Sequence, residues 1–446
     1  MPANPAPTNR PASLSPRDAW AYALLGGPLA MAALPIYVVV PNFYAAAMGL
    51  ELAVVGTVLM LARLLDAGLD PVFGVWSDRS ARLPGGRQRF VRAGLPVLAL
   101  GMLALFIPPT LEPVPAAAWL AVTVVVAYVG YSLISVSYQA WAAELATDPT
   151  VQTRLCALRE GCALAGVLVA SVLPTALANW WGQREAYGAY ACLFALVLLA
   201  AGAVTLRGAP RAPAQSATTT TAAGGWRAPL LDPAFRALAA VFVLNGLAVS
   251  IPSTLVLFYI ADLLQRPDLT GLFLGLYFLA AACGMPAWVA LAARLGLRRA
   301  WWLGMLLAVA AFAWAVGLGS GEVVPFALVC IASGLALGAD LAFPPALLAG
   351  VVEARADRDQ PGAAGLYFGW WNLLAKLTLA LAAGIALPLL GVLGYAPGQQ
   401  DAQGTAALAA IYALLPCALK VLAALLLTRV HAPSPRVPPE TSEVVP

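Results

Sequence analysis

Two aspartates, Asp66 and Asp70, lie four residues apart in a segment, 55–76, that is otherwise apolar enough to cross a membrane. Four residues is about one helical turn, so both carboxylates fall on one face of a helix, roughly 6 Å apart along its axis. A carboxylate in hydrocarbon costs several kcal/mol unless it faces protein or water. Two carboxylates on one face therefore predict a cation or proton site on the wall of a polar cavity.

Arg63 lies three residues before Asp66 on the same face, so a static ion pair that braces helix packing is the alternative. One guanidinium cannot neutralise both acids, which favours the cation site. Two close carboxylates can hold one sodium ion or share one proton. Pro71 follows Asp70 directly, and we expect it to kink the helix, because proline removes a backbone donor.

Lys376 lies in the middle of an apolar stretch, 363–393. An unpaired ammonium there would be costly, so we expect it to meet a carboxylate or an anionic group of a substrate. An ion pair to Asp340 or Asp66 without a role in transport is the alternative, and the residues leave both interpretations open.

Asp340 is the acid of a span that also contains Gly338 and the pair Pro344–Pro345. A broken helix facing a cavity would give Asp340 a role in substrate binding or gating, whereas a kinked helix would leave it a buried structural acid. Arg159 lies just before another span. Its position alone favours an anchor at the membrane surface over a substrate ligand.

Five aromatic residues near predicted span ends can stack on a sugar or lie at the membrane interface, and the interface is favoured. They are Tyr138, Trp141, Tyr367, Trp370 and Trp371. Tyr138 and Trp371 are kept as candidate substrate ligands. Asp262 and Lys420 also lie near span ends, where we expect their side chains to snorkel.

The composition indicates an integral membrane protein. The chain has 446 residues, of which 61% are hydrophobic and 10% charged, whereas soluble domains carry about 25% charged residues. Six scattered cysteines without a CxxC pair predict neither a disulfide framework nor a zinc site. The single histidine, His431, lies in the tail. The arginines form no cluster interleaved with aromatics, so we expect no nucleic-acid partner.

Windows of about 20 apolar residues predict twelve membrane-spanning helices. Their predicted limits are 20–47, 52–76, 93–109, 116–142, 160–178, 187–206, 236–262, 271–293, 301–319, 324–350, 363–393 and 405–428. Arginines are concentrated after every second span, whereas the opposite loops hold only Arg184 and Arg266. By the positive-inside rule both termini are predicted to be cytoplasmic.

The only long polar interior stretch, 207–232, is rich in Pro, Ala, Thr and Gly and is predicted to be a flexible linker. It divides the spans six and six, which is the plan of the major facilitator fold. We therefore predict an all-α membrane protein with an N-terminal tail (1–19), a first six-helix half (20–206), a linker (207–235), a second six-helix half (236–428) and a C-terminal tail (429–446).

Three segments, in order along the chain, resemble the glycoside–pentoside–hexuronide:cation symporters, the melibiose-carrier branch of the major facilitator superfamily. The first is DAGLDPVFGVWSDR at 66–79, followed by Gly86-Arg87 and Arg89. The second runs from Glu144 to Arg159. The third is GLYFGWWNLLAKL at 365–377, continuing to GVLGY at 391–395.

The resemblance implies roles for individual residues. Asp66 and Asp70 match the acidic pair that binds the coupling cation, with the Ser132 hydroxyl beside it. Lys376 matches a lysine placed near that site, and Arg159 matches an arginine that contacts sugar. The family also has a loop that supports conformational exchange. The residues of this chain that match it are Asp78, Arg79, Arg87 and Arg89.

The chain also departs from the melibiose carrier. Its first span has no acid in the stretch 25–30, and Ser135 stands where the carrier has an acid of its sugar site. These two differences argue against a melibiose-like substrate. Leu69 replaces a polar residue just before Asp70, which favours protons over sodium.

We expect a cation-coupled secondary transporter of a small organic solute, a sugar or glycoside, in the bacterial inner membrane. A lysolipid or amphiphile transporter of the same fold is the alternative, because the apolar first span suits a lipid tail. The candidate substrate ligands are Arg159, Lys376, Asp340, Ser135, Tyr138 and Trp371. We expect no enzyme activity and no cofactor, with a proton or sodium as coupling ion. The protein is expected to be a monomer.

Overall fold

The computed structural model describes residues 14–46, 48–83, 85–109, 112–145, 148–211, 225–356, 363–395 and 402–429, and every regular element in them is helical. The first half comprises α1 (Pro16–Ala23), α2 (Gly26–Ala46), α3 (Leu52–Ser80), α4 (Gly86–Phe106), α5 (Pro113–Leu145), α6 (Pro149–Trp181) and α7 (Gln183–Gly208). The second half comprises η1 (Gly225–Arg227), α8 (Ala228–Leu231), α9 (Pro233–Phe258), η2 (Tyr259–Leu263), η3 (Pro267–Leu269), α10 (Thr270–Leu295), α11 (Leu297–Ala315), α12 (Val323–Ala356), α13 (Ala364–Val392), α14 (Ala402–Ala409), η4 (Ala410–Leu414) and α15 (Leu415–Arg429).

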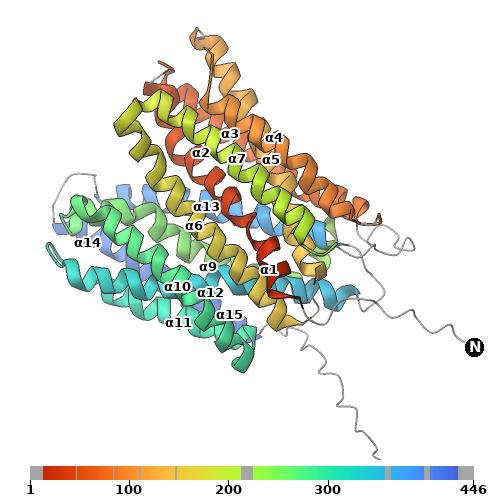
Figure 1. Ribbon diagram of the computed structural model, residues 1–446. Helices are drawn as coiled ribbons and strands as arrows, with labels where there is room; N and C mark the ends of the chain where they lie inside the picture. Colours follow the sequence, from red (N-terminus) through yellow and green to blue (C-terminus); the bar gives the residue numbers. More distant parts are fainter. Residues whose placement is uncertain are drawn as a thin grey trace, which may run out of the picture.

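The long helices lie at the twelve predicted positions. Nine helices of the described chain are long and apolar enough to cross a membrane by length and composition. Three more long helices, α2, α3 and α11, complete the set. In Figure 1 the first half (red to yellow-green) lies above the second half (green to blue), with α6 running along the boundary. We call the end with the α3–α4 and α5–α6 connections the basic end.

The first helix begins at a side-chain cap, four residues before the predicted start of the first span. Ser15 is the N-cap of α1, and its hydroxyl accepts a hydrogen bond from the Asp18 backbone N–H at 3.2 Å. The predicted first span, however, is not one helix. It breaks at Leu24 and Leu25 into α1 and α2, so that α2 begins at Gly26.

Several other helices differ from their predicted limits. α4 already begins at Gly86, so Arg87, Arg89 and Arg92 lie in its first turns and not in a loop. α12 and α13 are each continuous, so of the two alternatives for Pro344–Pro345, a broken helix and a kinked one, the break is absent. The interruptions are instead two π-helices, η2 and η4, which contact each other through the stacked rings of Tyr259 and Tyr412.

The linker is only partly described, because residues 212–224 and both predicted tails beyond 14–429 lie outside the described ranges. Its last residues are helical, in η1 and α8. The Trp226 ring stacks on Trp370 of α13 with centroids 5.8 Å apart, and the Trp226 carbonyl accepts a hydrogen bond from the Trp370 indole. This end of the predicted flexible linker is therefore packed against the second half.

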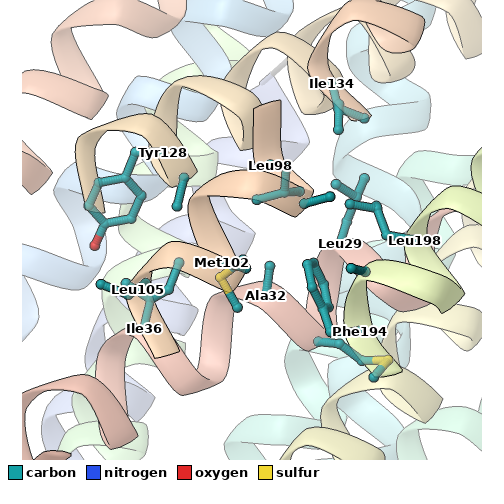
Figure 2. Packing of buried hydrophobic residues seen from close by; sticks show 14 of the residues in the cluster. Leu29, Ala32, Ile36, Leu98, Met102, Leu105, Tyr128, Ile134, Phe194 and Leu198 are labelled. Carbon is teal, nitrogen blue, oxygen red and sulfur yellow. The ribbon is translucent and has the colours of Figure 1, made fainter. Parts of the chain in front are cut away.

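Each half has its own apolar core, and the halves share packing at the basic end. Figure 2 shows part of the core of the first half, with Leu29, Met102 and Phe194 interdigitating between their helices. A second cluster joins Ala140, Ala143, Ala157 and Leu164 of the first half to α10, α12 and α13 of the second. A third cluster, around Tyr259 and Tyr412, contains second-half residues only. The apolar seam between the halves is thus at the basic end.

Candidate functional site

The two predicted acids lie around the ammonium of Lys376. Its Nζ is 2.6 Å from Asp66 Oδ2 and 2.7 Å from Asp70 Oδ2. Ser132 donates a hydrogen bond to Asp66 Oδ1 at 2.7 Å and accepts one from Lys376 at 3.2 Å. Asp66, Asp70 and Ser132 are almost completely buried. We refer to these four residues as the carboxylate site.

The carboxylate site joins the two halves. Asp66 and Asp70 lie on α3 and Ser132 on α5, whereas Lys376 comes from α13 of the second half. Glycines allow the close approach of α3 and α13. A Cβ atom built on Gly369 would lie 2.5 Å from the Asp70 carbonyl oxygen, and one on Gly74 would lie 2.3 Å from the Gly365 carbonyl oxygen. Only glycine fits where two backbones touch in this way.

The structure identifies the charge partner of each buried acid. Lys376 pairs with Asp66 and Asp70, and Asp340 pairs with Lys420. Whether the Lys376 pair takes part in transport or only braces the helices stays a prediction. Asp70 Oδ1 is buried and has no hydrogen-bond partner among the described residues. Two carboxylates face one ammonium, so the site carries one uncompensated negative charge when both acids are ionised.

A cavity of about 540 Å³ lies between the halves. Its walls come from α2, α5 and α6 of the first half and from α9, α10 and α12 of the second. Three of the predicted substrate ligands line it, namely Ser135, Tyr138 and Arg159. The acid-free stretch of the first span also forms part of the wall, through Gly26, Leu29 and Ala30. Lys376, Asp340 and Trp371 are not among the lining residues.

The polar wall of the cavity is built on α5 and α6. Arg159 donates from Nε, at 3.0 Å, and from Nη2 to Oε1 of the adjacent Glu160. Tyr138 donates to the Tyr22 carbonyl and stacks on the Tyr22 ring with centroids 4.3 Å apart. The Ser135 hydroxyl is buried and has no hydrogen-bond partner within the described chain.

Two of the four predicted gating residues, Asp78 and Arg87, join Glu144 in a polar cluster at the basic end, which we call the latch. Asp78 accepts hydrogen bonds from the backbone N–H groups of Gly365 at 2.6 Å and Leu366 at 2.8 Å, in the first turn of α13. Arg87 is completely buried and donates to Asp78 at 2.7 Å and to both carboxylate oxygens of Glu144, at 2.8 and 2.6 Å. Arg79 and Arg89 are exposed and stand apart from the latch.

Asp340 belongs to a separate buried network in the second half. Its Oδ2 accepts a hydrogen bond from Lys420 at 2.6 Å, and its Oδ1 accepts from Asn245 at 3.0 Å and Trp301 at 2.9 Å. Lys420 is 1% exposed, so the expectation that it snorkels is wrong. Asp262 is buried as well and accepts a hydrogen bond from Tyr395. The proposed contact of Asp340 with substrate stays a prediction, and the geometry favours the structural alternative.

Four of the five aromatic residues do not lie in the favoured interfacial belt, whereas Trp370 is partly exposed. Trp141, Tyr138, Tyr367 and Trp371 are at most 4% exposed. Trp371 stacks on Phe242 of α9, with centroids 3.9 Å apart. The belt assignment used position along the chain alone, which does not tell a helix face that meets lipid from one that meets protein.

Sequence reasoning missed three residues that complete these sites. Neither Glu144 nor Glu160 was assigned a role from the sequence, yet Glu144 pairs with Arg87 and Glu160 pairs with Arg159. Lys420 is a charged residue in an apolar stretch, which indicates that it has a buried partner. Because it was placed at a span end, its side chain was expected to reach water instead.

Two helical halves with a cavity and an ion-paired site between them have the plan of the major facilitator fold. The family model described as MFS/sugar transport protein matches residues 20–432. The chain therefore belongs to this family, and the resemblance to the glycoside–pentoside–hexuronide:cation symporters is confirmed.

Curated relatives are symporters and a transporter. The chain is 26% identical over 241 residues to the inner membrane symporter YicJ of Escherichia coli, covering 53% of this chain and 52% of that protein. It is 26% identical over 143 residues to the putative glycoside/cation symporter YagG of the same organism (32% of this chain and 31% of that protein) and 22% identical over 165 residues to the isoprimeverose transporter of Lactiplantibacillus pentosus (37% and 34%). The chain thus spans about half the length of the first relative and about a third of the other two.

Solved structures share the fold. A bacterial homologue of the iron transporter ferroportin, in an outward-facing state, matches with a TM-score of 0.68 at 20% identity, covering 92% of this chain and 99% of that chain. The fucose:proton symporter FucP of Escherichia coli matches with a TM-score of 0.65 at 14% identity, covering 93% and 97%.

Proposed function

We propose that this protein is a cation-coupled secondary transporter of a small organic solute, a sugar or glycoside, which works by alternating access in the bacterial inner membrane. The family and the symporters among its relatives support this activity. Both termini and the basic end face the cytoplasm, in keeping with the arginine-rich connections there.

One observation carries the proposal, namely that Lys376 of the second half lies between Asp66 and Asp70 of the first. The lysine acts as a tethered cation that holds the two halves together when no coupling ion is bound. One proton or one sodium ion is the charge that the site lacks. Asp70 Oδ1, buried without a partner in the described chain, is an acceptor for that ion.

Entry of the coupling ion weakens the hold on Lys376, because part of the carboxylate charge is then neutralised. The contact between α3 and α13 loosens, and the free-energy difference between the two arrangements of the halves changes. Ion binding thereby biases the conformational equilibrium, which is what coupling requires. A membrane potential of about 100 mV adds about 2.3 kcal/mol for each charge that moves across the membrane.

The latch on the same helix pair links ion binding to access. Asp78 lies on α3, two turns beyond Asp70, and caps the first turn of α13, the helix that carries Lys376. An acid at a helix N-terminus is favoured by the unpaired backbone N–H groups and by the helix dipole. With the latch and the apolar seam both made, the cytoplasmic side is closed, so this conformer receives its ligands from the periplasm.

The test is ion-driven uptake by protein reconstituted in vesicles, with the solute found by a thermal-shift screen of sugars and glycosides. We expect Asp70→Asn to abolish accumulation above the external concentration, because the site then lacks the excess negative charge that attracts the ion. Membrane insertion and solute binding should persist. The matched control is Asp268→Asn, because Asp268 is an exposed acid that lies far from the carboxylate site.

Concentrative uptake that survives in both Asp66→Asn and Asp70→Asn would show that coupling occurs elsewhere. Performing the assay with a proton gradient alone and with a sodium gradient alone identifies the coupling ion.

A further inference from the structure

The cavity between the halves has a chemically divided wall. Most lining side chains from α2 and from the second half are apolar, among them Leu29, Phe278 and Leu341. Ser253 and Tyr277 add two hydroxyls on the side of the second half. Polar groups gather on α5 and α6, where the lining includes Ser135, Tyr138, Gln139, Arg159 and Glu160. A ligand that fits both surfaces has one hydroxylated end and one apolar end.

Arg159, the only cation on the lining within the part of the chain that the structure describes, is already neutralised. Arg159 donates from Nε and from Nη2 to the same oxygen of Glu160. The side chains of Arg159 and Glu160 are 9% and 19% exposed. The pair therefore brings no net charge to the cavity. An anionic solute would have to separate Arg159 from Glu160 and would leave the Glu160 carboxylate beside its own negative charge.

The polar wall offers hydrogen bonds for an uncharged group. Ser135 is a lining residue and is only 4% exposed; its hydroxyl oxygen is buried and has no hydrogen-bond partner among the described residues, so a small rotation of the side chain would turn it to the cavity. Buried polar atoms are normally paired, so an unpaired hydroxyl on a cavity wall indicates a ligand atom that completes it. A sugar hydroxyl, which both donates and accepts, suits this position and the nearby Arg159–Glu160 pair.

The α2 part of the wall, which lies beside Arg159, carries no polar side chain among its lining residues. No acid stands on the stretch of α2 that lines the cavity, where Gly26, Leu29, Ala30 and Ala33 lie instead. A Cβ on Gly26 would lie 2.6 Å from the Arg159 carbonyl oxygen, so α2 approaches the polar wall as closely as its backbone permits. An aromatic or alkyl group buried against this wall would gain affinity by leaving water.

From these observations we infer that the transported solute is an uncharged glycoside with an apolar aglycone, and that Glu160 determines this specificity by neutralising Arg159. The inference rests on the proposed transport function but concerns binding alone. The sugar lies at Ser135, Arg159 and Glu160, and the aglycone lies against Leu29, Ala33 and Leu341. Glu160 is a specificity residue, because its removal frees Arg159 to bind a carboxylate.

The test is calorimetric binding to the purified full chain, without any ion gradient. The probes are the 4-nitrophenyl glycosides of glucose, galactose and xylose, the methyl glycosides of the same sugars, and the 4-nitrophenyl glucuronide and galacturonide. We expect at least one nitrophenyl glycoside to bind about ten-fold or more tightly than its methyl counterpart. For glucose and galactose, the nitrophenyl glycoside should likewise bind about ten-fold or more tightly than the matching uronide.

Glu160→Gln should shift the ratio of glycoside to uronide affinity toward the uronide by about ten-fold or more, because the Arg159 charge is then free. Glu51→Gln, which removes an exposed acid at the start of α3, should leave the ratio unchanged. Ala33→Asn, which adds an amide to the apolar wall, should reduce the preference for nitrophenyl over methyl glycosides.

Three results would overturn the inference: no binding of any nitrophenyl glycoside, equal affinity of wild-type protein for glycoside and uronide, or an unchanged ratio in folded Glu160→Gln. Tighter binding of lysophosphatidylcholine than of every glycoside would also overturn it and would favour an amphiphile transporter. Because no gradient is present, loss of coupling in Asp70→Asn leaves these results unaffected. Conversely, coupled uptake of sugars without an aglycone would refute this inference and leave the transport function standing.

Discussion

At the scale of single residues, the two buried charge clusters differ in balance. In the second half one carboxylate, Asp340, faces one ammonium, Lys420, and Asn245 and Trp301 satisfy the remaining oxygen. In the carboxylate site two acids share one ammonium, and a buried oxygen is left unpaired within the described chain. A balanced, fully bonded pair stabilises one arrangement, whereas an unbalanced site retains affinity for a further cation.

The balanced pair should matter for stability. Lys420→Met leaves the Asp340 carboxylate buried without its charge partner, and we expect a loss of about 3 kcal/mol or more. The apparent unfolding temperature of the purified protein measures this loss. The double variant Asp340→Leu with Lys420→Met should recover part of it, because no lone charge remains buried. An unfolding temperature that is unchanged in Lys420→Met would mean that the pair is not the support described here.

At the scale of elements, α3 and α13 carry most of the proposed mechanism. Their contact runs from the carboxylate site through Gly74, Gly365 and Gly369 to the Asp78 cap. The backbones touch at the glycines, so the distance between these helices has little freedom while the polar contacts are made. Two polar contacts on one rigid helix pair can respond as a unit.

Gly74→Ala tests the close contact. A Cβ at this position would lie 2.3 Å from the Gly365 carbonyl oxygen, so α3 and α13 must separate or lose this conformer. We expect ion-driven uptake to fall at least about ten-fold. The matched control is Gly68→Ala on the same helix, where a Cβ meets nothing within 4 Å and alanine favours the helix. Equal uptake by the two variants would contradict the importance of the contact.

At the scale of the whole molecule, the two halves meet through polar and apolar contacts at the basic end. The latch contributes Asp78, Arg87 and Glu144, and the apolar seam contributes Ala140 and Leu164. Alternating access requires both sets to be broken together. Their strength therefore sets the balance between the two arrangements of the halves.

Asp78→Ala should shift this balance toward opening at the basic end. Losing a helix cap costs about 1 to 2 kcal/mol, which changes the ratio of conformers about five- to thirty-fold. Spin labels at Leu83 and Leu295, exposed residues near this end on the two halves, report the change as a longer distance. Arg79→Ala, at the exposed neighbour of Asp78, is the control. Identical distance distributions for Asp78→Ala and wild type would argue against the latch.

Much of the fold followed from the sequence because apolar length is a local property. A helix in lipid must satisfy its own backbone hydrogen bonds, so about twenty apolar residues predict a span without reference to any neighbour. The Ser15 cap and the pair Asp66–Asp70 depend on spacing within one or two turns and were also predictable. Helix ends in polar sequence were harder to predict. Arg87, for example, was placed in a loop although it lies inside α4.

Partners across the molecule were decided by the tertiary structure alone. Lys376 is 306 residues away from Asp70, and nothing local shows that it chooses Asp66 and Asp70 over Asp340. The same holds for Lys420 with Asp340 and for the burial of Trp141 and Trp371. The sequence alone shows which charged residues of a membrane helix need a partner, because the cost of burying a charge belongs to each residue. Which residue supplies the opposite charge depends on how the helices pack, because an ion pair requires atoms a few ångströms apart.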